Sequence, residues 1–385
     1  MDLTGLTLEP AVVKALRWID THVEPIVEEA IRICEIPAPT FEEAERAAYV
    51  KGRFEQLALA DVTIDRAGNV RGRRPGAGGG LGVAVGAHLD TVFPKGTDVR
   101  VKRDGSRLLA PGIGDNSVAV ASLLAMVEAL DAGGVRTVGD LYLTCNTGEE
   151  GLGDLKGMKV FVADVKDRVK ALVALEGMKI NRIIHTAVGS RRYKITFTAR
   201  GGHSWGHFPS PSAIHILGRA IADISRLEVP SDPKTTYNVG VVHGGTTVNT
   251  IASQAEMLVD MRSVDIRSLA DLERRILGII ERTAKEGDGK ATLDLVGDRP
   301  AGSIPGTHPV VETCKAVHRA LGLQTFTEAS STDVNAALGV GLPGVCISIT
   351  EGANEHRLDE YIETGPIPTG IKNVLLATVA LAGKA

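Results

Sequence analysis

The chain has 385 residues, a formal net charge of -4 and 43% hydrophobic residues, which excludes a disordered protein and argues against a nucleic-acid partner. Its length exceeds one ordinary compact core, so we expect two domains. We find neither a targeting sequence nor a run of membrane-spanning length, so we expect no membrane partner. The four cysteines are far apart, which favours reduced thiols in a cytoplasmic protein.

The first predicted elements are helices at residues 11–36 and 41–57, where apolar residues recur at helical spacing. A short apolar run at residues 82–87 follows and is typical of a buried strand in a parallel sheet. It leads directly into His88 and Asp90. Ligands bind beyond the carboxyl ends of such strands, and side chains two residues apart share one face. This segment alone leaves open either a metal site or an ordinary strand end.

Three more acidic segments follow predicted strands or precede a helix. Asp115 lies just before a predicted helix at residues 118–130, and the strand at residues 139–144 leads into Gly148-Glu149-Glu150-Gly151. Another strand, at residues 171–175, ends in Glu176. This rhythm predicts an α/β fold with a mostly parallel sheet and helices on both faces.

The rhythm changes after residue 189. Residues 192–295 read as strand, helix, strand, strand, helix and strand, which is the split order of a ferredoxin-like α+β domain. The first pattern then resumes with a helix at 310–321, a strand at 344–349 and a helix at 370–381. We therefore predict an α/β domain of residues 1–189 and 298–385, with an inserted domain of residues 190–297.

Histidines and acids accumulate at these strand and loop ends. The set comprises His88, Asp90, Asp115, Glu149, Glu150, Glu176 and His356. Two adjacent acids between glycines repel each other and have no helical support, so a structural role explains them poorly. Imidazole and carboxylate ligands together suit zinc. The candidates exceed the needs of one tetrahedral site, which favours two metal ions that share a carboxylate.

Seven short motifs carry a resemblance to a known family. They are His88-Leu89-Asp90-Thr91, Gly114-Asp115-Asn116, Gly148-Glu149-Glu150, Leu175-Glu176, Gly202-His203-Ser204, Asn249-Thr250-Ile251 and Glu355-His356. In this order the chain resembles the M20 family of zinc-dependent peptidases and deacylases. Further segments, Ser331-Thr332-Asp333 among them, are similar to its peptidase T-like branch.

The resemblance implies a role for each candidate residue. His88 and Glu176 would bind one zinc ion, Glu150 and His356 the other, and Asp115 both. Cobalt or manganese could replace zinc. Asp90 would orient His88, and Glu149 would be the general base.

The inserted domain would be a lid that also forms a homodimer. The resemblance implies that His203 donates to the developing oxyanion, and that Asn249 and Arg262 contact the substrate. Two departures bear on this comparison. Ser117-Val118 replaces the usual Lys and Gly after the Asp-Asn pair, and Glu176 stands where aminopeptidases of the family tend to have Asp.

We therefore expect a dizinc hydrolase that cleaves the amide bond of small peptides or N-acyl amino acids. The nearest alternative is a tripeptide aminopeptidase. A catalytically silent metal-binding protein is the alternative from another class, although all the ligand candidates and Glu149 are present. A nucleotide-binding oxidoreductase would rest on Gly112 and Gly114 only, without the third glycine of that motif.

Overall fold

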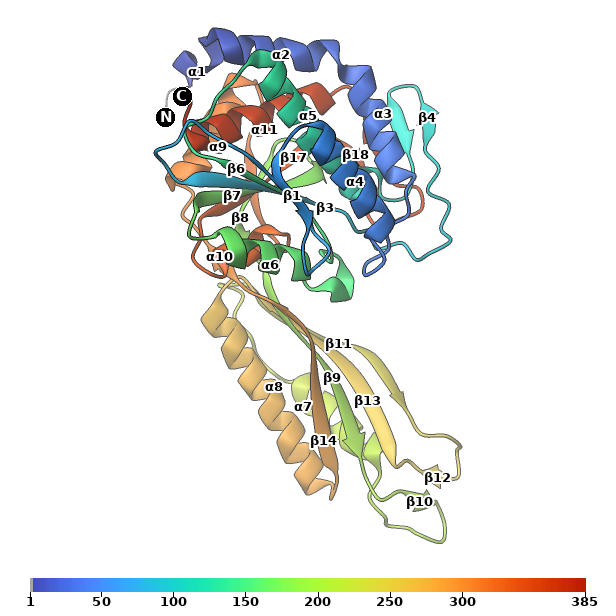
Figure 1. Cartoon of the computed structure of the whole chain (residues 1–385). Coiled ribbons are helices and arrows are strands. Elements are labelled where there is room, and N and C mark those ends of the chain that lie inside the picture. The colour runs from blue at the N-terminus through green and yellow to red at the C-terminus, as the bar shows by residue number, and fades with distance from the viewer. Residues whose placement is uncertain (1–2) are drawn as a thin grey trace. The chain divides into compact units, whose positions relative to one another are not determined.

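The computed structural model describes residues 3–385 and divides into two compact units (Figure 1). The first unit comprises Met1–Ala187 and Ser303–Ala385, and the second comprises Val188–Gly302. The inserted domain expected at residues 190–297 falls within the second unit.

A nine-stranded mixed sheet forms the centre of the first unit, in the order β1-β2-β6-β3-β7-β17-β8-β15 with β16 beside β8. The strands are β1 (Ala60–Ile64), β2 (Val70–Arg74), β3 (Gly82–His88), β6 (Leu141–Asn146), β7 (Val169–Met178), β8 (Arg182–Ala187), β15 (Gly302–Ser303), β16 (Phe326–Ser330) and β17 (Gly344–Thr350). The central strands β6, β3, β7 and β17 are parallel. Because β1 and β2, β2 and β6, and β17 and β8 pair antiparallel, the sheet is mixed. The predicted parallel pairing holds for this centre and for β16 beside β8.

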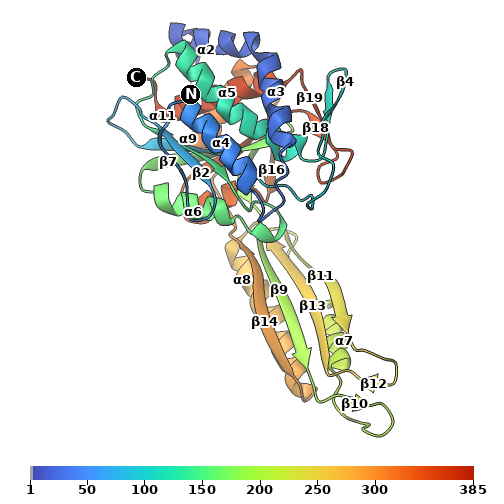
Figure 2. The same ribbon diagram turned by 45° about the vertical axis from the view of Figure 1, so that its right-hand side comes forward.

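Helices cover both faces of the sheet (Figure 1, Figure 2). They are α1 (Thr4–Leu8), α2 (Pro10–Thr21), α3 (Val23–Cys34), α4 (Ala44–Gln56), α5 (Val118–Gly133), α6 (Lys156–Val165), α9 (Pro309–Ala320), α10 (Val334–Leu338) and α11 (Ile367–Ala382). Along β3, Val83 and Val85 join the core with α2, α5 and α11, whereas Ala84 joins the core with α6 and α10. Both faces of this strand are therefore buried, which explains its unbroken apolar run.

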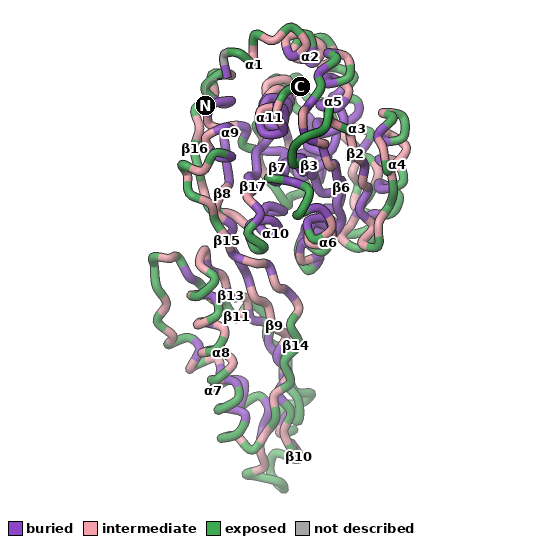
Figure 3. Tube along the Cα trace, turned by 60° about the vertical axis from the view of Figure 1, so that its left-hand side comes forward, coloured by how far each residue is buried: buried purple, intermediate pink, exposed green. Residues whose placement is uncertain are grey.

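Helix α5 is the central helix of the first unit. With the turn before it, Ile113–Gly133 is long and apolar enough to cross a membrane, a run that our sequence analysis did not identify. The segment is, however, 94% buried inside the protein, and the trace in Figure 3 is buried along α5. Its apolar composition is therefore that of a core helix.

The second unit is a four-stranded antiparallel sheet in the order β11-β13-β9-β14, with its two long helices packed against it. Its elements are β9 (Gly189–Thr198), β10 (Gly202–His203), α7 (Ala213–Ile224), β11 (Thr235–Gly244), β12 (Thr250–Ile251), β13 (Gln254–Ser263), α8 (Ile266–Glu286) and β14 (Lys290–Arg299). The order of the long elements is the split ferredoxin-like order. The short strands β10 and β12 pair with each other as a separate ribbon.

A small antiparallel sheet of the first unit, in the order β18-β19-β5-β4, borders the turn that carries Asp115. Its strands are β4 (Lys102–Asp104), β5 (Arg107–Leu109), β18 (Gly352–Ala353) and β19 (Tyr361–Glu363). The turn itself is η1 (Ile113–Ser117), and a second short turn, η2 (Gly151–Gly153), follows Glu150. Neither these two turns nor this sheet was predicted from the sequence.

Candidate active site

The carboxyl ends of three parallel strands bring the first candidate residues together. His88 is the last residue of β3 and pairs with Asn146, the last residue of β6. On the other side of β3, Ala87 pairs with Leu175 of β7, so Glu176 lies beside the end of β3. The loop with Glu149 and Glu150 begins directly after β6. The sheet register therefore gathers these side chains at one edge, as ligand sites in α/β sheets require.

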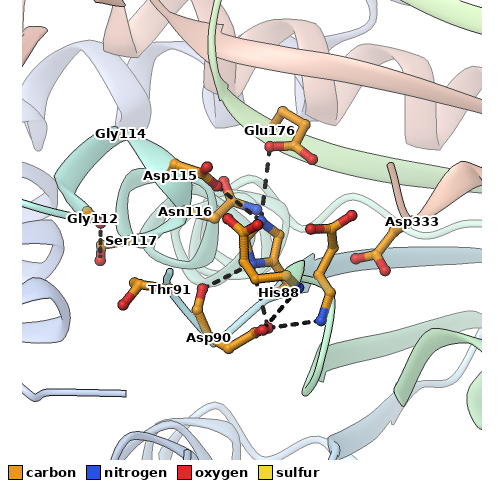
Figure 4. A network of polar contacts seen from close by, with 12 residues as sticks. His88, Asp90, Thr91, Gly112, Gly114, Asp115, Asn116, Ser117, Glu176 and Asp333 are labelled. Carbon is orange, nitrogen blue, oxygen red and sulfur yellow. Dashed lines mark hydrogen bonds and ion pairs between the residues drawn. The ribbon is translucent and has the colours of Figure 1, made fainter. Parts of the chain in front are cut away.

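Asp115 lies between the two predicted histidine ligands. Its Oδ1 is 3.0 Å from Nε2 of His88, and its Oδ2 is 3.1 Å from Nε2 of His356. Figure 4 shows the carboxylate of Asp115 close to the ring of His88. Each oxygen of one carboxylate thus faces a different imidazole, which is the arrangement that a bridging ligand needs.

Two more carboxylates complete the cluster. Glu176 Oε2 lies 3.9 Å from Nε2 of His88, and Glu150 Oε1 lies 3.3 Å from Nε2 of His356. One ligand atom each from His88, Asp115 and Glu150 lies within 4.8 Å of the other two. The structure therefore brings all five predicted ligands into one cluster. Four of them are buried, whereas 55% of the His356 side chain is exposed.

The charges in this cluster shift one another's pKa. Burial alone would raise the pKa of Asp115, but hydrogen bonds with His356 and His88 hold it below its ordinary value. Burial and the charge of Asp115 raise the pKa of Glu150 to about 7. Hydrogen bonds with Asp115 and Glu150 raise the pKa of His356 to about 11. The histidines thus balance the buried carboxylates, a task that a bound cation would also perform.

Asp90 contacts His88, but chiefly through its backbone. Nδ1 of His88 lies 3.0 Å from the carbonyl oxygen of Asp90 and 3.6 Å from its carboxylate. The two carboxylate oxygens accept the backbone N–H groups of Glu149 and Glu150, each at 2.9 Å. Thr40 donates its hydroxyl to the same carboxylate at 3.0 Å. Asp90 therefore fixes both the ring of His88 and the loop that follows β6.

Glu149, the predicted general base, is buried at the same edge of the sheet. Its backbone N–H is held by Asp90, and the preceding N–H, of Gly148, donates to Glu43 at 3.1 Å. Three consecutive amides of this loop are therefore anchored by carboxylates. Because the loop cannot rotate freely, the direction in which the Glu149 side chain leaves it is restricted.

Three buried acids beside the cluster were not predicted as site residues. Glu43 holds the Gly148 amide, and Glu360 holds the turn before α5. Asp333 accepts from the side chain of Asn146 at 2.8 Å, and burial raises its pKa to about 7. Asp333 lay in a motif that our sequence analysis quoted without a role. Glu360 lay in another segment that is similar to the peptidase T-like branch, His356-Arg357-Leu358-Asp359-Glu360. For Glu43 the only signal was an acid near a candidate segment, which is common in loops.

The second unit contains the remaining predicted residues, and two of them lie side by side. His203 of β10 pairs with Thr250 of β12, and the backbone N–H of Ser204 donates to the carbonyl of Asn249 at 3.0 Å. Nδ1 of the exposed His203 accepts the backbone N–H groups of Trp205 and Gly206 at 3.2 and 3.3 Å. A neutral His203 ring must then carry its proton on Nε2, which makes Nε2–H a hydrogen-bond donor.

Arg262 lies in β13 of the four-stranded sheet, not in the separate ribbon of β10 and β12. It is eight residues beyond the start of β13, or about 25 Å along an extended strand. Its Nε donates to Asp260 at 2.7 Å, and 42% of its side chain is exposed. Within the second unit, Arg262 is therefore separate from His203 and Asn249.

Sequence models of two peptidase families match parts of the chain. Residues 186–288 match the model described as a peptidase dimerisation domain, of the M20 type. Residues 69–205 match the model of peptidase family M28. The first match covers most of the second unit, and the second covers the segments with His88, Asp115, Glu150 and Glu176.

Two curated relatives match over most of the chain. An uncharacterized protein YqjE of Bacillus subtilis is 23% identical, with 84% of this chain and 90% of that protein covered. The acetylornithine deacetylase of Klebsiella pneumoniae is 26% identical, with 74% and 76% covered.

Two solved structures share the fold. Aminopeptidase PepT of Bacillus cereus superposes with a TM-score of 0.79 at 22% identity, with 94% of this chain and 99% of that chain covered. YXEP of Bacillus subtilis, a dinuclear metal-binding peptidase, superposes with a TM-score of 0.71 at 17% identity, with 94% and 99% covered. Both likenesses extend over nearly the entire fold.

Proposed function

The chain belongs to the M20 family of peptidases and deacylases, and on this premise we propose that it is a dizinc hydrolase of small peptides or N-acyl amino acids. The observation that carries the proposal is the carboxylate of Asp115, whose two oxygens each contact a different histidine. Such a carboxylate suits two metal ions that share one ligand.

The donor set fits a metal pair. Two imidazole nitrogens and three carboxylates converge, and a mixture of nitrogen and oxygen ligands suits zinc, with cobalt and manganese as substitutes. We assign His88 and Glu176 to one ion, Glu150 and His356 to the other, and Asp115 to both. When bound there, such ions supply the activation of water and the polarisation of the amide carbonyl.

Glu149 is the proposed general base. It accepts a proton from the attacking water and returns it to the nitrogen of the amide bond that breaks, so the protein is unchanged after one turnover. Its support is its place directly before Glu150, in a loop anchored by Asp90 and Glu43. Asp90 positions this loop and the ring of His88.

Residues of the second unit are proposed to contact the substrate. His203 would donate a hydrogen bond from Nε2 to the developing oxyanion, a role that its tautomer supports. Asn249, beside it, would contact the reacting carbonyl group. Arg262 would bind a substrate carboxylate, although Asp260 already occupies its Nε. Alanine variants should raise KM for Arg262 and lower kcat for His203.

The match to a dimerisation domain supports a homodimer formed through the second unit. The four cysteines, all free and buried, support a reducing compartment, in agreement with the expected cytoplasmic location. Light scattering of the purified chain would test the dimer.

The substrate class follows from a panel of amides. Purified protein loaded with zinc should be assayed on dipeptides, tripeptides, N-acetyl amino acids and N-succinyl amino acids. Turnover restricted to tripeptides would favour the aminopeptidase alternative, which the similarity to the PepT fold supports. Turnover restricted to acyl amino acids would reject both peptidase activities.

Glu149→Gln separates an enzyme from a silent metal-binding protein. The variant should lose about 100-fold or more of turnover, because proton transfer contributes that much, while two metal ions remain bound. A parent protein that binds two metal ions but cleaves no amide in the panel would contradict the proposed hydrolase.

A further inference from the structure

Glu360 is a fully buried acid that the proposed chemistry does not use. Its Oε1 accepts the backbone N–H groups of Gly114 and Asp115 at 2.7 and 2.9 Å, and its Oε2 accepts that of Gly112 at 3.2 Å. One side chain therefore satisfies three backbone donors of a single turn. Buried backbone donors left without an acceptor would destabilise the turn.

The turn that Glu360 holds is the one that presents Asp115. It is irregular, because Gly112 has a left-handed φ of 79° and Asp115 and Asn116 have non-helical backbone angles. Regular helical hydrogen bonds cannot define such a turn. The carboxylate of Glu360 supplies the acceptors in their place, so the direction of the Asp115 side chain depends on it.

Glu360 also belongs to the segment that presents His356. Its backbone N–H donates to the carbonyl of Arg357 at 3.1 Å, and its own carbonyl accepts the N–H of Ala110 at 3.1 Å. The next residue, Tyr361, begins β19, which pairs with β5. The segment after His356 is thus joined through Glu360 to the Asp115 turn and to Ala110, just before that turn.

We infer that Glu360 is a positioning residue that fixes Asp115 relative to His356. It thereby sets the geometry of the metal site that Asp115 forms with Glu150 and His356. The inference rests on the proposed function, since it assigns both residues to a metal ion. Asp90 has the same construction on the other side of the cluster, because its carboxylate holds the amides of Glu149 and Glu150. Two carboxylates that bind no metal thus anchor the two loops that carry Asp115 and Glu150.

A glutamine in place of Glu360 makes a precise test. The side-chain amide of glutamine has one acceptor oxygen in place of two. If this oxygen accepts the backbone N–H groups of Gly114 and Asp115, the amide NH₂ faces the N–H of Gly112, and two donors then oppose each other. Glu360→Asp keeps the carboxyl group and withdraws it by one methylene group. Glu363→Gln is the matched control, because Glu363 lies at the far end of β19 and binds Arg107 and Ser106.

The full-length apoprotein is titrated with Zn²⁺ and with Co²⁺. Calorimetry measures the affinity for each metal ion, and the visible spectrum of bound cobalt reports the geometry of the site. We expect both Glu360 variants to weaken one of the two sites about 10- to 100-fold, as for other residues that support metal ligands. Excess metal should restore turnover. The other site, which shares Asp115, should weaken by less, and the Glu363→Gln control should keep both affinities of the parent.

Two results would overturn the inference alone. One is a parent that binds two ions and variants that bind both with the same affinity and cobalt spectrum. The other is a lower Tm of the apoprotein with unchanged metal affinities, which would make Glu360 purely structural. If Gln prevents folding, the Asp variant decides by the same criteria. A parent that binds no metal pair would instead overturn the proposed function, and this inference with it.

Discussion

Asp115 Oδ2 lies 3.1 Å from Nε2 of His356, although 241 positions of the chain separate the two residues. The other oxygen of the same carboxylate contacts His88. The carboxylate of Asp115 thus contacts both histidines of the cluster. The occupancy of each of the two proposed metal sites should therefore depend on Asp115.

Asp115→Ala should reduce the bound metal from two ions to one or none. Turnover should fall by more than the roughly 10- to 100-fold typical for residues that only support a ligand. Metal analysis after gel filtration and a peptidase assay would measure both effects. The exposed acid Asp104 offers a control, since Asp104→Ala should change neither quantity. Two ions retained at parental affinity in Asp115→Ala would contradict the bridging role.

Metal binding should release protons and should weaken as the pH falls. Hydrogen bonds with Asp115 and Glu150 raise the pKa of His356 to about 11, and burial raises the pKa of Glu150 to about 7. At neutral pH the apoprotein therefore holds protons at these two ligands. A metal ion must displace them, because it binds neutral imidazole and ionised carboxylate.

Calorimetric titrations of the apoprotein in buffers of different ionisation enthalpy measure this release directly. We expect at least about one proton per metal pair near pH 7, and an affinity that increases from about pH 6 to pH 8. A binding enthalpy that is independent of the buffer would show that no proton leaves. His356 would then be neutral before the metal binds.

The positions of the ligands along the chain were predictable, but their neighbours in space were not. The apolar run of β3 identifies a buried strand, and the change from apolar to polar residues at His88 marks the end of this strand. The local sequence does not predict that β6 and β7 flank β3, because the order of the strands depends on pairing across the whole sheet. The family resemblance supplied that information. The antiparallel direction of β2 was missed because apolar patterns do not encode strand direction, and β8 was not predicted as a strand.

The role of Asp90 shows a second limit of the sequence. Residues two apart on a strand share a face, which predicted that its carboxylate holds the ring of His88. Strand β3, however, ends at His88, so the alternation stops before Asp90. Its carbonyl lies 3.0 Å from Nδ1 of His88 and its carboxylate 3.6 Å, and the carboxylate also binds the amides after β6. Glu360 was missed for a similar reason, since backbone donors leave no trace in residue types.

Asp90→Ala should lower metal affinity or turnover by about 10- to 100-fold without removing a metal ligand. The variant leaves the amides of Glu149 and Glu150 without their acceptor, so the loop that carries the general base loses its anchor. Thr40→Val removes only one of the donors to Asp90 and should have a smaller effect in the same direction. Unchanged turnover and metal affinity in Asp90→Ala would contradict its positioning role.

His318 should make the first unit less stable below about pH 6.5. The ring is fully buried, lies 2.9 Å from the hydroxyl of Thr325 and 3.2 Å from the side-chain nitrogen of Asn373, and burial lowers its pKa to about 4. The unfolded chain has the ordinary pKa and therefore binds a proton first as the pH falls. The free energy of unfolding then decreases between about pH 6.5 and pH 4, by at most about 3 kcal/mol.

Urea unfolding of the parent and of His318→Gln across this pH range isolates the contribution of His318 to the free energy of unfolding. His22, which is exposed to solvent in part and stacks on Trp18, supplies the control in His22→Gln. A parent and a His318→Gln variant with the same dependence on pH would contradict this prediction.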